Sequence, residues 1–313
     1  MENIFGPVPS RRLGRSIGIN NIPPKVCSYS CVYCQLGRAI EMAAERRGFY
    51  DPAELTEAAG RRVDELREKG ERIDYLTIVP DGEPTLDIHL GELIEGLRRF
   101  EIPVALISNG SLMANPALRE ELRSLDWLSI KVDAADEESW RRIDRPHKQI
   151  DFDRMRGGIK FLADTFKGVL TTETMLVKRV NDSREEIDAV AGFIETLEPV
   201  KAYISIPTRP PAETWVSPAD EESIAYAYGK FASVVPFVEN LTGYEGNEFT
   251  ASGDARSDLL SITAVHPMRR DAVEALLERD GAEIDVLYEL LHAEELVEVK
   301  FEGSTYYVRK LRT

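Results

Sequence analysis

All three cysteines of this 313-residue chain, Cys27, Cys31 and Cys34, lie within eight consecutive positions. Their spacing of four and three residues would put the thiols on one face of a helix, where free cysteines often pack as small apolar side chains. The surrounding segment, "IPPKVCSYSCVYCQLG", contains adjacent prolines, two serines and a glycine, a composition that favours a loop. Thiols grouped in a loop are suited to bind a metal centre.

The spacing of the thiols fits some metal and redox sites better than others. A structural zinc ion usually has four Cys or His ligands, but all four histidines are remote from the cysteines in the sequence: His89, His147, His266 and His292. A catalytic dithiol would use Cys31 and Cys34 and leave Cys27 unexplained. Iron–sulfur clusters are commonly held by four thiolates, so a cubane bound here would keep one iron without a cysteine ligand. We favour this cluster; the helical stripe, zinc and the dithiol are the alternatives.

The charge of the chain is strongly acidic but unevenly distributed. It has 39 basic and 55 acidic residues, a net charge of −16, which argues against tight, non-specific binding to nucleic acid backbones. Residues 1–50 instead carry seven basic and three acidic groups. This excess indicates either an anion site beside the thiols or ordinary solvated surface.

The pattern of apolar residues bears on the compartment. No apolar run approaches the roughly 18–20 residues needed to cross a bilayer, and the start, "MENIFGPVPS", lacks the pattern of a secretion signal. We therefore expect a cytoplasmic protein without a membrane partner, in a compartment where thiols stay reduced.

Apolar runs that read as buried strands alternate with helical patterns after the cysteines. The predicted strands are residues 15–19, 75–79, 104–108, 127–132, 169–177 and 201–206. Several of the helical segments between them open with an Asp or Asn cap, in some cases followed by proline. Six strands that alternate with helices predict a parallel sheet.

Unusual polar segments follow most of these strands. They are the cysteine loop, "PDGEPT" (80–85), "SNGS" (108–111), "DA" (133–134) and "PTRPP" (207–211). Each could be an ordinary turn when taken alone. The carboxyl ends of parallel strands, however, form the active-site face of α/β barrels and doubly wound sheets. We therefore expect these distant segments to converge on one site.

A segment rich in Gly, Asn and Ser, "NLTGYEGNEFTASGD", follows a predicted helix near residues 219–235. We predict a core domain of residues 1–240, a linker at 241–253 and a small domain of residues 254–313. The small domain reads as a strand ("LLSITAV"), two helices and a hairpin, an order that suggests a winged helix. Its eight basic and thirteen acidic residues argue against a DNA partner and favour contact with a protein or peptide, or structural support.

The cysteine spacing C-x₃-C-x₂-C, with Tyr33 directly before the last cysteine, resembles the signature of the radical S-adenosylmethionine (radical SAM) superfamily. Asp81-Gly82-Glu83-Pro84 resembles the family's Gly-Gly-Glu-type motif, which binds the methionine amino group, except that Asp81 replaces the first glycine. Ser108-Asn109-Gly110 and the "KVDA" of Lys131–Ala134 resemble segments that contact the ribose and carboxylate. The resemblance covers about residues 10 to 210 and includes the segments 171–178 and 204–208, both near the adenosine.

This resemblance implies a partial (β/α)₆ barrel with a [4Fe-4S] cluster on Cys27, Cys31 and Cys34. The amino and carboxylate groups of SAM would chelate the fourth iron, and one electron would cleave SAM to methionine and a 5′-deoxyadenosyl radical that takes a hydrogen atom from substrate. The implied SAM-binding residues are Tyr33, Gly82, Glu83, Pro84, Ser108, Asn109, Lys131, Asp133 and Pro207. For Asp133, a cap of the helix "DEESWRRI" is an equal alternative. The implied electron donor is a ferredoxin or flavodoxin, and no catalytic residue is assigned.

Two further passages, "GPVPSRRLGRSIGIN" and "VNDSREEIDAVAGFIETLEPVKAYISIPTRPPAE", resemble a branch related to the tRNA wyosine-base synthases. Those enzymes use additional N-terminal cysteines to bind a second cluster, and this chain has no such cysteines. They also use a lysine that forms a Schiff base. Lys131 and Lys178 are candidates for this role, although an ion-paired lysine is the simpler interpretation of each. Three hypotheses therefore stay open: an enzyme acting on a protein or peptide, a tRNA-modifying enzyme that uses the cluster of Arg11, Arg12 and Arg15 against phosphate, and a non-catalytic cluster protein for electron relay or sensing. A further interpretation of the arginines is that they bind carboxylates of SAM or of the protein itself.

Overall fold

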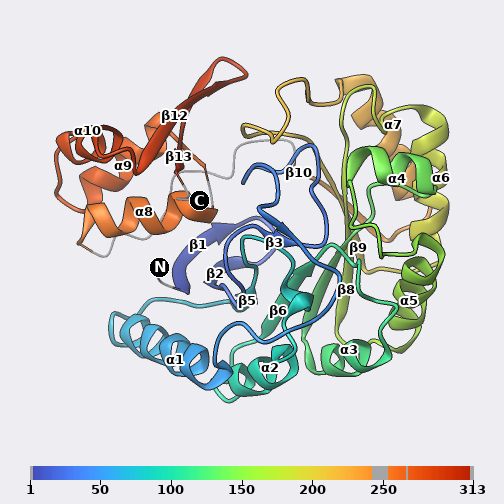
Figure 1. Cartoon of the computed structure of the whole chain (residues 1–313), viewed down its shortest axis with the longest axis horizontal. Coiled ribbons are helices and arrows are strands. Elements are labelled where there is room, and N and C mark those ends of the chain that lie inside the picture. The colour runs from blue at the N-terminus through green and yellow to red at the C-terminus, as the bar shows by residue number, and fades with distance from the viewer. Residues whose placement is uncertain (1–2, 242–252, 266, 311–313) are drawn as a thin grey trace.

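A computed structural model of the chain describes residues 3–241, 253–265 and 267–310. Its centre is an eight-stranded sheet, seen inside the outer helices in Figure 1. In spatial order the strands are β1 (Ile4–Ser10), β2 (Gly14–Ile19), β5 (Tyr75–Ile78), β6 (Val104–Ser108), β7 (Trp127–Lys131), β8 (Val169–Met175), β9 (Lys201–Ser205) and β10 (Phe237–Leu241). β1 is antiparallel to β2, and every other neighbouring pair is parallel.

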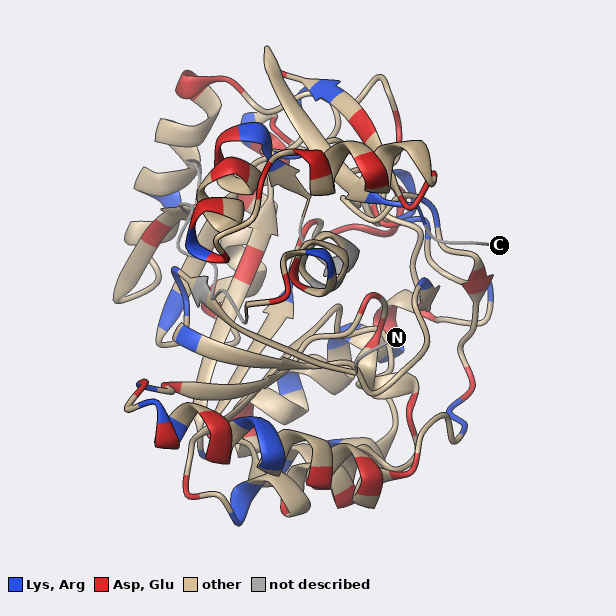
Figure 2. Cartoon of the chain, turned by 90° about the vertical axis from the view of Figure 1, so that its left-hand side faces the viewer, with Lys and Arg blue, Asp and Glu red and all other residues tan. Residues whose placement is uncertain are grey.

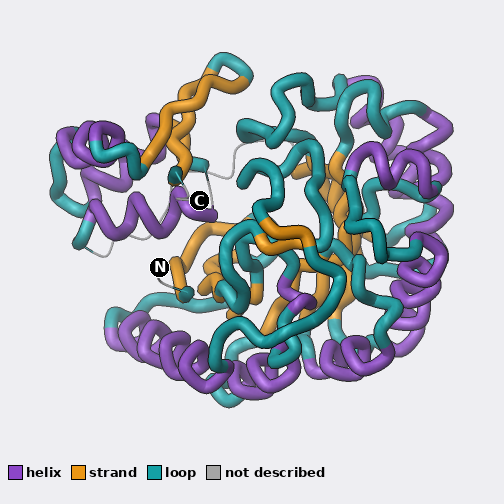
Figure 3. Tube along the Cα trace, viewed as in Figure 1, coloured by secondary structure: helices purple, strands orange, loops and turns teal. Residues whose placement is uncertain are grey.

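Helices cover the outer face of this sheet, and the cysteine loop crosses its open side (Figure 3). The helices are α1 (Pro52–Glu68), α2 (Leu90–Arg98), α3 (Pro116–Glu121), α4 (Glu137–Ile143), α5 (Phe152–Thr165), α6 (Arg184–Glu195) and α7 (Glu221–Ala232). The predicted caps are present; for example, Asp51 accepts from the amide of Ala53 at 2.8 Å, with Pro52 at the first helical position. Within the described residues, no helix combines the length and apolar character that a bilayer span requires.

All six predicted strands are confirmed to within two residues at each end. β1 and β10 were not predicted. The sequence of β1 contains a glycine and two prolines, which are unfavourable inside a sheet but tolerated at an edge, and β1 is an edge strand with a register shift between Phe5 and Val8. β10 is short and borders the expected linker. That linker, 241–253, lies almost entirely outside the described residues, so the domain boundary stays a prediction.

The C-terminal region forms a second, smaller unit with a three-stranded antiparallel sheet. Its elements are α8 (Ala255–Val265), β11 (Met268–Arg269), α9 (Arg270–Arg279), α10 (Asp285–His292), β12 (Leu296–Phe301) and β13 (Ser304–Arg309). The predicted helices and hairpin are confirmed, but the predicted strand "LLSITAV" is wrong, because it belongs to α8. Ala255, Leu259 and Ile262 are all buried at helical spacing, so core packing overrides the strand propensity of the β-branched residues.

Contacts between described residues join this unit to the barrel, among them contacts at β1 and at the segment that follows β9. The Tyr306 hydroxyl of β13 donates to the carbonyl of Thr208 at 2.8 Å, and Val8 of β1 packs against the core of the C-terminal unit. Figure 2 shows acidic and basic positions mixed along the helices on this side of the molecule. Because of the hydrogen bond from Tyr306 to Thr208, the hairpin contacts the segment that follows β9.

Two adjacent glycines in α5 provide a test of the packing of this helix. A Cβ at Gly158 would lie 2.1 Å from the carbonyl oxygen of Met113, whereas a Cβ at Gly157 would meet nothing within 4 Å. We expect Gly158→Ala to lower the free energy of unfolding by about 1–3 kcal/mol through overpacking. Gly157→Ala should raise it by about 0.5–1 kcal/mol. Denaturant unfolding of both variants measures this contrast, and equal stabilities would refute the close approach.

Candidate functional site

The three cysteines line one cavity of about 320 Å³ at the carboxyl ends of the parallel strands. Seven of the nine predicted SAM-binding residues line the same cavity: Tyr33, Gly82, Glu83, Ser108, Asn109, Lys131 and Pro207. Pro84 and Asp133 are not among its lining residues. Pro84 begins the short helix η1 (Pro84–Leu86), and Asp133 lines a small inner cavity with Trp140 and Asp144. The expected convergence is therefore observed for the cysteine loop and for the segments that follow β5, β6 and β9, but not for Asp133 and Ala134, which line the inner cavity.

Glu83 joins the ends of β5 and β6. One of its carboxylate oxygens accepts from the Ser108 hydroxyl at 2.7 Å, and the other accepts from the Asn109 amide at 2.8 Å. Thr85 also donates to it, from its amide and its hydroxyl. Burial raises the pKa of Glu83, and these hydrogen bonds oppose that shift by stabilising the charged form. The structure thus holds a buried carboxylate in a fixed orientation beside the thiols.

The loop that carries Glu83 is packed directly on the start of the cysteine loop. The Lys25 amide donates to the Asp81 carbonyl at 2.6 Å, and the Glu83 amide donates to the Val26 carbonyl at 3.2 Å. Gly82 lies between these bonds, where a Cβ would be only 2.0 Å from the Val26 oxygen. A glycine is required here because the two backbones touch.

Contacts with neighbouring elements hold the rest of the cysteine loop, since most of it has no regular secondary structure. Strand β3 (Val26–Cys27) pairs with β4 (Glu41–Met42), and the Val32 amide donates to the carbonyl of Ile143 at 2.9 Å. Arg38 forms a double hydrogen bond to Glu213, at 2.8 and 3.0 Å. The loop therefore depends on the finished barrel for its shape.

The environment of the thiols suits a metal centre. Burial raises the pKa of Cys27, Cys31 and Cys34, so they would become thiolates only with a compensating cation, which bound iron supplies. Within the described ranges, no three His, Cys, Asp or Glu side chains converge closely enough for a single ion. Zinc would need that geometry, whereas each thiolate of a cubane binds a different iron. The residues present thus fit a cluster that is held at three corners.

Sequence comparison agrees with this geometry. The family model described as the radical SAM superfamily matches residues 21–191, more than half of the chain. The chain belongs to the radical SAM superfamily. This superfamily uses a [4Fe-4S] cluster and S-adenosylmethionine, so both predicted cofactors are confirmed.

Individual relatives of this radical SAM protein extend the match. It is 41% identical to a UPF0026 protein of Methanocaldococcus jannaschii over 100% of this chain and 98% of that protein. A structure of TYW1 with a lysine–pyruvate adduct bound is 18% identical, with a TM-score of 0.51, and the match covers 72% of this chain and 76% of the other. A radical SAM methyltransferase from Sphaerobacter thermophilus is 13% identical, with a TM-score of 0.54 and coverage of 72% and 66%. The two structures share the fold.

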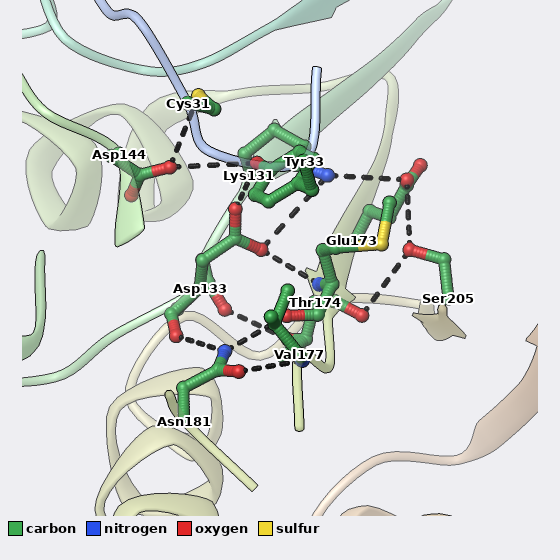
Figure 4. A network of polar contacts seen from close by, with 12 residues as sticks. Cys31, Tyr33, Lys131, Asp133, Asp144, Glu173, Thr174, Val177, Asn181 and Ser205 are labelled. Atoms are coloured by element: carbon green, nitrogen blue, oxygen red, sulfur yellow. Dashed lines mark hydrogen bonds and ion pairs between the residues drawn. The ribbon is translucent and has the colours of Figure 1, made fainter. Parts of the chain in front are cut away.

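Polar contacts connect the cysteine loop of this radical SAM protein to Ser205 of β9 on the opposite side of the cavity (Figure 4). The chain of contacts runs from Cys31 through Asp144, Tyr33, Asp133 and Lys131 to Glu173 and Ser205. Asp133 also accepts from the Met175 amide at 2.7 Å. The helix cap proposed for it is wrong, because Asp136 caps α4.

Lys131 and Glu173 form the charged centre of this network. The Lys131 ammonium lies 3.3 Å from Glu173, 3.9 Å from Asp133 and 4.8 Å from the centre of the Tyr33 ring. Burial alone would raise the pKa of Glu173, but the adjacent Arg12 and Lys131 charges outweigh it and hold this pKa at about 2. Glu173 is therefore a permanent anion inside the cavity.

Several cavity residues were not singled out from the sequence, namely Arg12 as a lining residue, Gln35, Glu173, Ser205 and Arg209, although the last four lie in segments that were expected near the site. A signal for Glu173 was present, because a lone acid inside the strand "VLTTETM" implies a buried partner. Within the arginine cluster, Arg12 pairs with Glu173 and Arg15 with Glu71. For these two arginines the protein's own carboxylates are the partners.

Asp81, the residue that departs from the family motif, gives a pH prediction. Burial raises its pKa from 3.8 to about 7, against the opposing effect of Arg309 and Lys25. Because the folded-state pKa lies above the unfolded value, the protonated carboxyl stabilises the fold at low pH, and this contribution is lost as pH rises through 7. The stability of the wild type relative to Asp81→Asn should fall by about 1 kcal/mol between pH 6 and pH 8. Anaerobic denaturant unfolding at both pH values measures it; a constant difference would contradict the shift.

Proposed function

We propose that this protein is an enzyme that reductively cleaves S-adenosylmethionine and uses the product to take a hydrogen atom from a substrate. When bound, the cluster and SAM supply a 5′-deoxyadenosyl radical. The observation that carries this proposal is that the three thiols and the fixed carboxylate of Glu83 line one cavity. An electron relay has no need for that carboxylate beside an iron that lacks a cysteine.

Each of the surrounding residues would bind a different part of SAM. Glu83, oriented by Ser108 and Asn109, accepts from the amino group of SAM. Lys131 provides the cation that pairs with the carboxylate. Pro207, two residues after the end of β9, contributes an apolar wall beside the adenosine. Glu83, Ser108 and Pro207 are buried, which limits the access of water to a reactive species.

The decisive experiment is anaerobic reconstitution with iron and sulfide, followed by addition of dithionite and SAM. We expect release of 5′-deoxyadenosine and methionine in amounts that depend on the reductant. A protein with a normal cluster spectrum that releases no 5′-deoxyadenosine would be a relay or sensor, and the proposal would be wrong.

Glu83→Ala tests the binding step. Loss of a charged hydrogen bond typically weakens binding about 10- to 100-fold. Binding of SAM should change the EPR signal of the reduced cluster, and the SAM concentration at which half of this change is reached should rise by that factor. Glu95→Ala, on the exposed face of α2, is the matched control. An unchanged affinity in Glu83→Ala, with the SAM-free cluster spectrum intact, would remove Glu83 from the SAM site.

For the substrate we favour a protein or peptide, with the C-terminal unit as its docking module. The helix–strand–helix–helix–hairpin order of this unit supports our proposal that it is a winged helix, and such modules offer grooves and strand edges to extended peptides. Its excess of acidic residues disfavours nucleic acid. The tRNA-modifying alternative predicts salt-dependent binding of tRNA to the holoenzyme. If tRNA does not bind in this way, the peptide hypothesis is favoured.

The electron donor we propose is a ferredoxin or flavodoxin in the cytoplasm.

A further inference from the structure

The side chain of Asn109 has a fixed orientation beside the cysteine loop. Its carbonyl oxygen accepts from the Ser111 amide at 2.9 Å, so its NH₂ group is the end that faces Ser28 and Cys27. The nitrogen lies 2.9 Å from the Ser28 hydroxyl oxygen and 3.8 Å from the Cys27 sulfur. A carboxamide nitrogen has two hydrogens to donate. One is used by Ser28, and the other is available to Cys27.

The segments on either side of this contact are also joined by other hydrogen bonds. The Asn109 amide donates to the Glu83 carboxylate at 2.8 Å, and the hydroxyl groups of Ser28 and Ser111 form a hydrogen bond of 2.6 Å. Both serines are buried. The protein itself therefore determines the position of the carboxamide relative to Cys27.

The sulfur of Cys27 has further hydrogen-bond donors around it. Burial raises the pKa of this thiol, and hydrogen bonds from the backbone amides of Tyr29 and Ser28 oppose that shift. The sulfur of Cys31 lies instead 3.3 Å from a carboxylate oxygen of Asp144. Cys27 is thus a cysteine whose sulfur has N–H groups directed at it.

Hydrogen bonds to a ligand sulfur affect the electron affinity of a cluster. A thiol sulfur is a weak acceptor, but a thiolate ligand carries negative charge, and hydrogen bonds to charged acceptors are shorter and stronger. Hydrogen bonds to the sulfur atoms are among the factors that set the reduction potential of an iron–sulfur cluster. Since reduction adds negative charge, an N–H donor stabilises the reduced state more than the oxidised state.

We propose that the side chain of Asn109 donates a hydrogen bond to the Cys27 ligand and thereby raises the reduction potential of the cluster. In this role Asn109 acts on the cluster through Cys27. The inference does not depend on the proposed function, because an electron relay would have the same hydrogen bond and the same potential. It also does not require the SAM contact that the sequence predicts for Asn109.

The test compares the midpoint potential of the reconstituted cluster in the wild type and in Asn109→Leu, by anaerobic redox titration followed by EPR without SAM. Leucine is close to asparagine in size but has no hydrogen-bond donor. We expect the equilibrium constant for one-electron reduction to fall about tenfold, which corresponds to a potential about 59 mV more negative. Iron and sulfide analysis should show the same cluster content in both proteins.

Ser111→Ala is the matched control, because it breaks the hydrogen bond between the two serine hydroxyls and leaves the Asn109 donor in place. We expect its potential to equal that of the wild type. An unchanged potential in Asn109→Leu, or an equal fall in Ser111→Ala, would overturn the proposal.

A second variant, Asn109→Ser, decides the question if Asn109→Leu does not assemble a cluster. Serine keeps an acceptor for the Ser111 amide but has no NH₂ group, so we expect the same fall in potential. An unchanged potential in Asn109→Ser would then overturn the proposal. Release of 5′-deoxyadenosine by the same wild-type preparation, after addition of SAM, tests the proposed function separately.

Discussion

Cys31→Ala is expected to lose the cluster and to reduce 5′-deoxyadenosine release to the level seen without protein. Cys31 is one of only three cysteines, so the variant would offer a cubane two thiolates. A cluster with two of its irons lacking cysteine ligands is not expected to survive, because such clusters are commonly held by four ligands. Iron and sulfide analysis should show a fall from about four irons per chain to nearly none, and the visible absorption of the cluster should disappear.

Ser30→Ala is the matched control for this variant. Ser30 is the neighbour of Cys31 in the loop, and its hydroxyl accepts from the Ala39 amide at 3.2 Å. We expect this variant to keep its cluster and to release 5′-deoxyadenosine, since a single local hydrogen bond contributes only about 1 kcal/mol. If Cys31→Ala kept a full complement of iron, the assignment of Cys31 as a ligand would be wrong.

Gly82→Ala is expected to weaken SAM binding by about 100-fold or more while leaving the three thiols in place. The new methyl group would lie 2.0 Å from the Val26 carbonyl oxygen and 3.0 Å from Ile22, so the loop that carries Glu83 must move away from the cysteine loop. Overpacking of this kind costs about 1–3 kcal/mol in stability. Displacement of a binding group by about 1 Å can lower activity by a factor of about 100.

SAM titration of the reduced cluster by EPR measures the binding loss, and denaturant unfolding measures the stability loss. Gly157→Ala, which adds the same methyl group in open space, should bind SAM normally. Normal SAM affinity in Gly82→Ala would show that the two loops do not need their close approach.

The sequence predicted those parts of the fold that local patterns determine. The central strands are runs of buried apolar residues with helices between them, and this alternation predicted six of the parallel strands correctly. The helix α8 was missed because its sequence, "ARSDLLSITAV", contains β-branched residues whose helical state depends on the core of the C-terminal unit. β1 was missed because its prolines are acceptable only at an edge, and edge position is a property of the whole sheet.

The residues of the site likewise include some that local sequence patterns predict and others that only the tertiary structure brings together. Cysteine spacing and the polar residues after each strand identified most of the cavity lining. Arg12 and Glu173, however, are 161 residues apart, and only the closing of the barrel brings the β1–β2 turn against β8. Asp81 was noted as a departure from the family motif, but the charge of Arg309 that lowers its pKa comes from the C-terminal unit. Contacts of this range are outside the reach of local patterns.

The hydrogen bond from Tyr306 to the Thr208 carbonyl affects how a truncation experiment should be interpreted. Removing the C-terminal unit would also remove a support of the segment that carries Arg209, so a shortened protein would lose activity even if that unit never touched a substrate. Tyr306→Phe separates the two effects, because it deletes a single oxygen atom and keeps every surface of the unit available for recruitment.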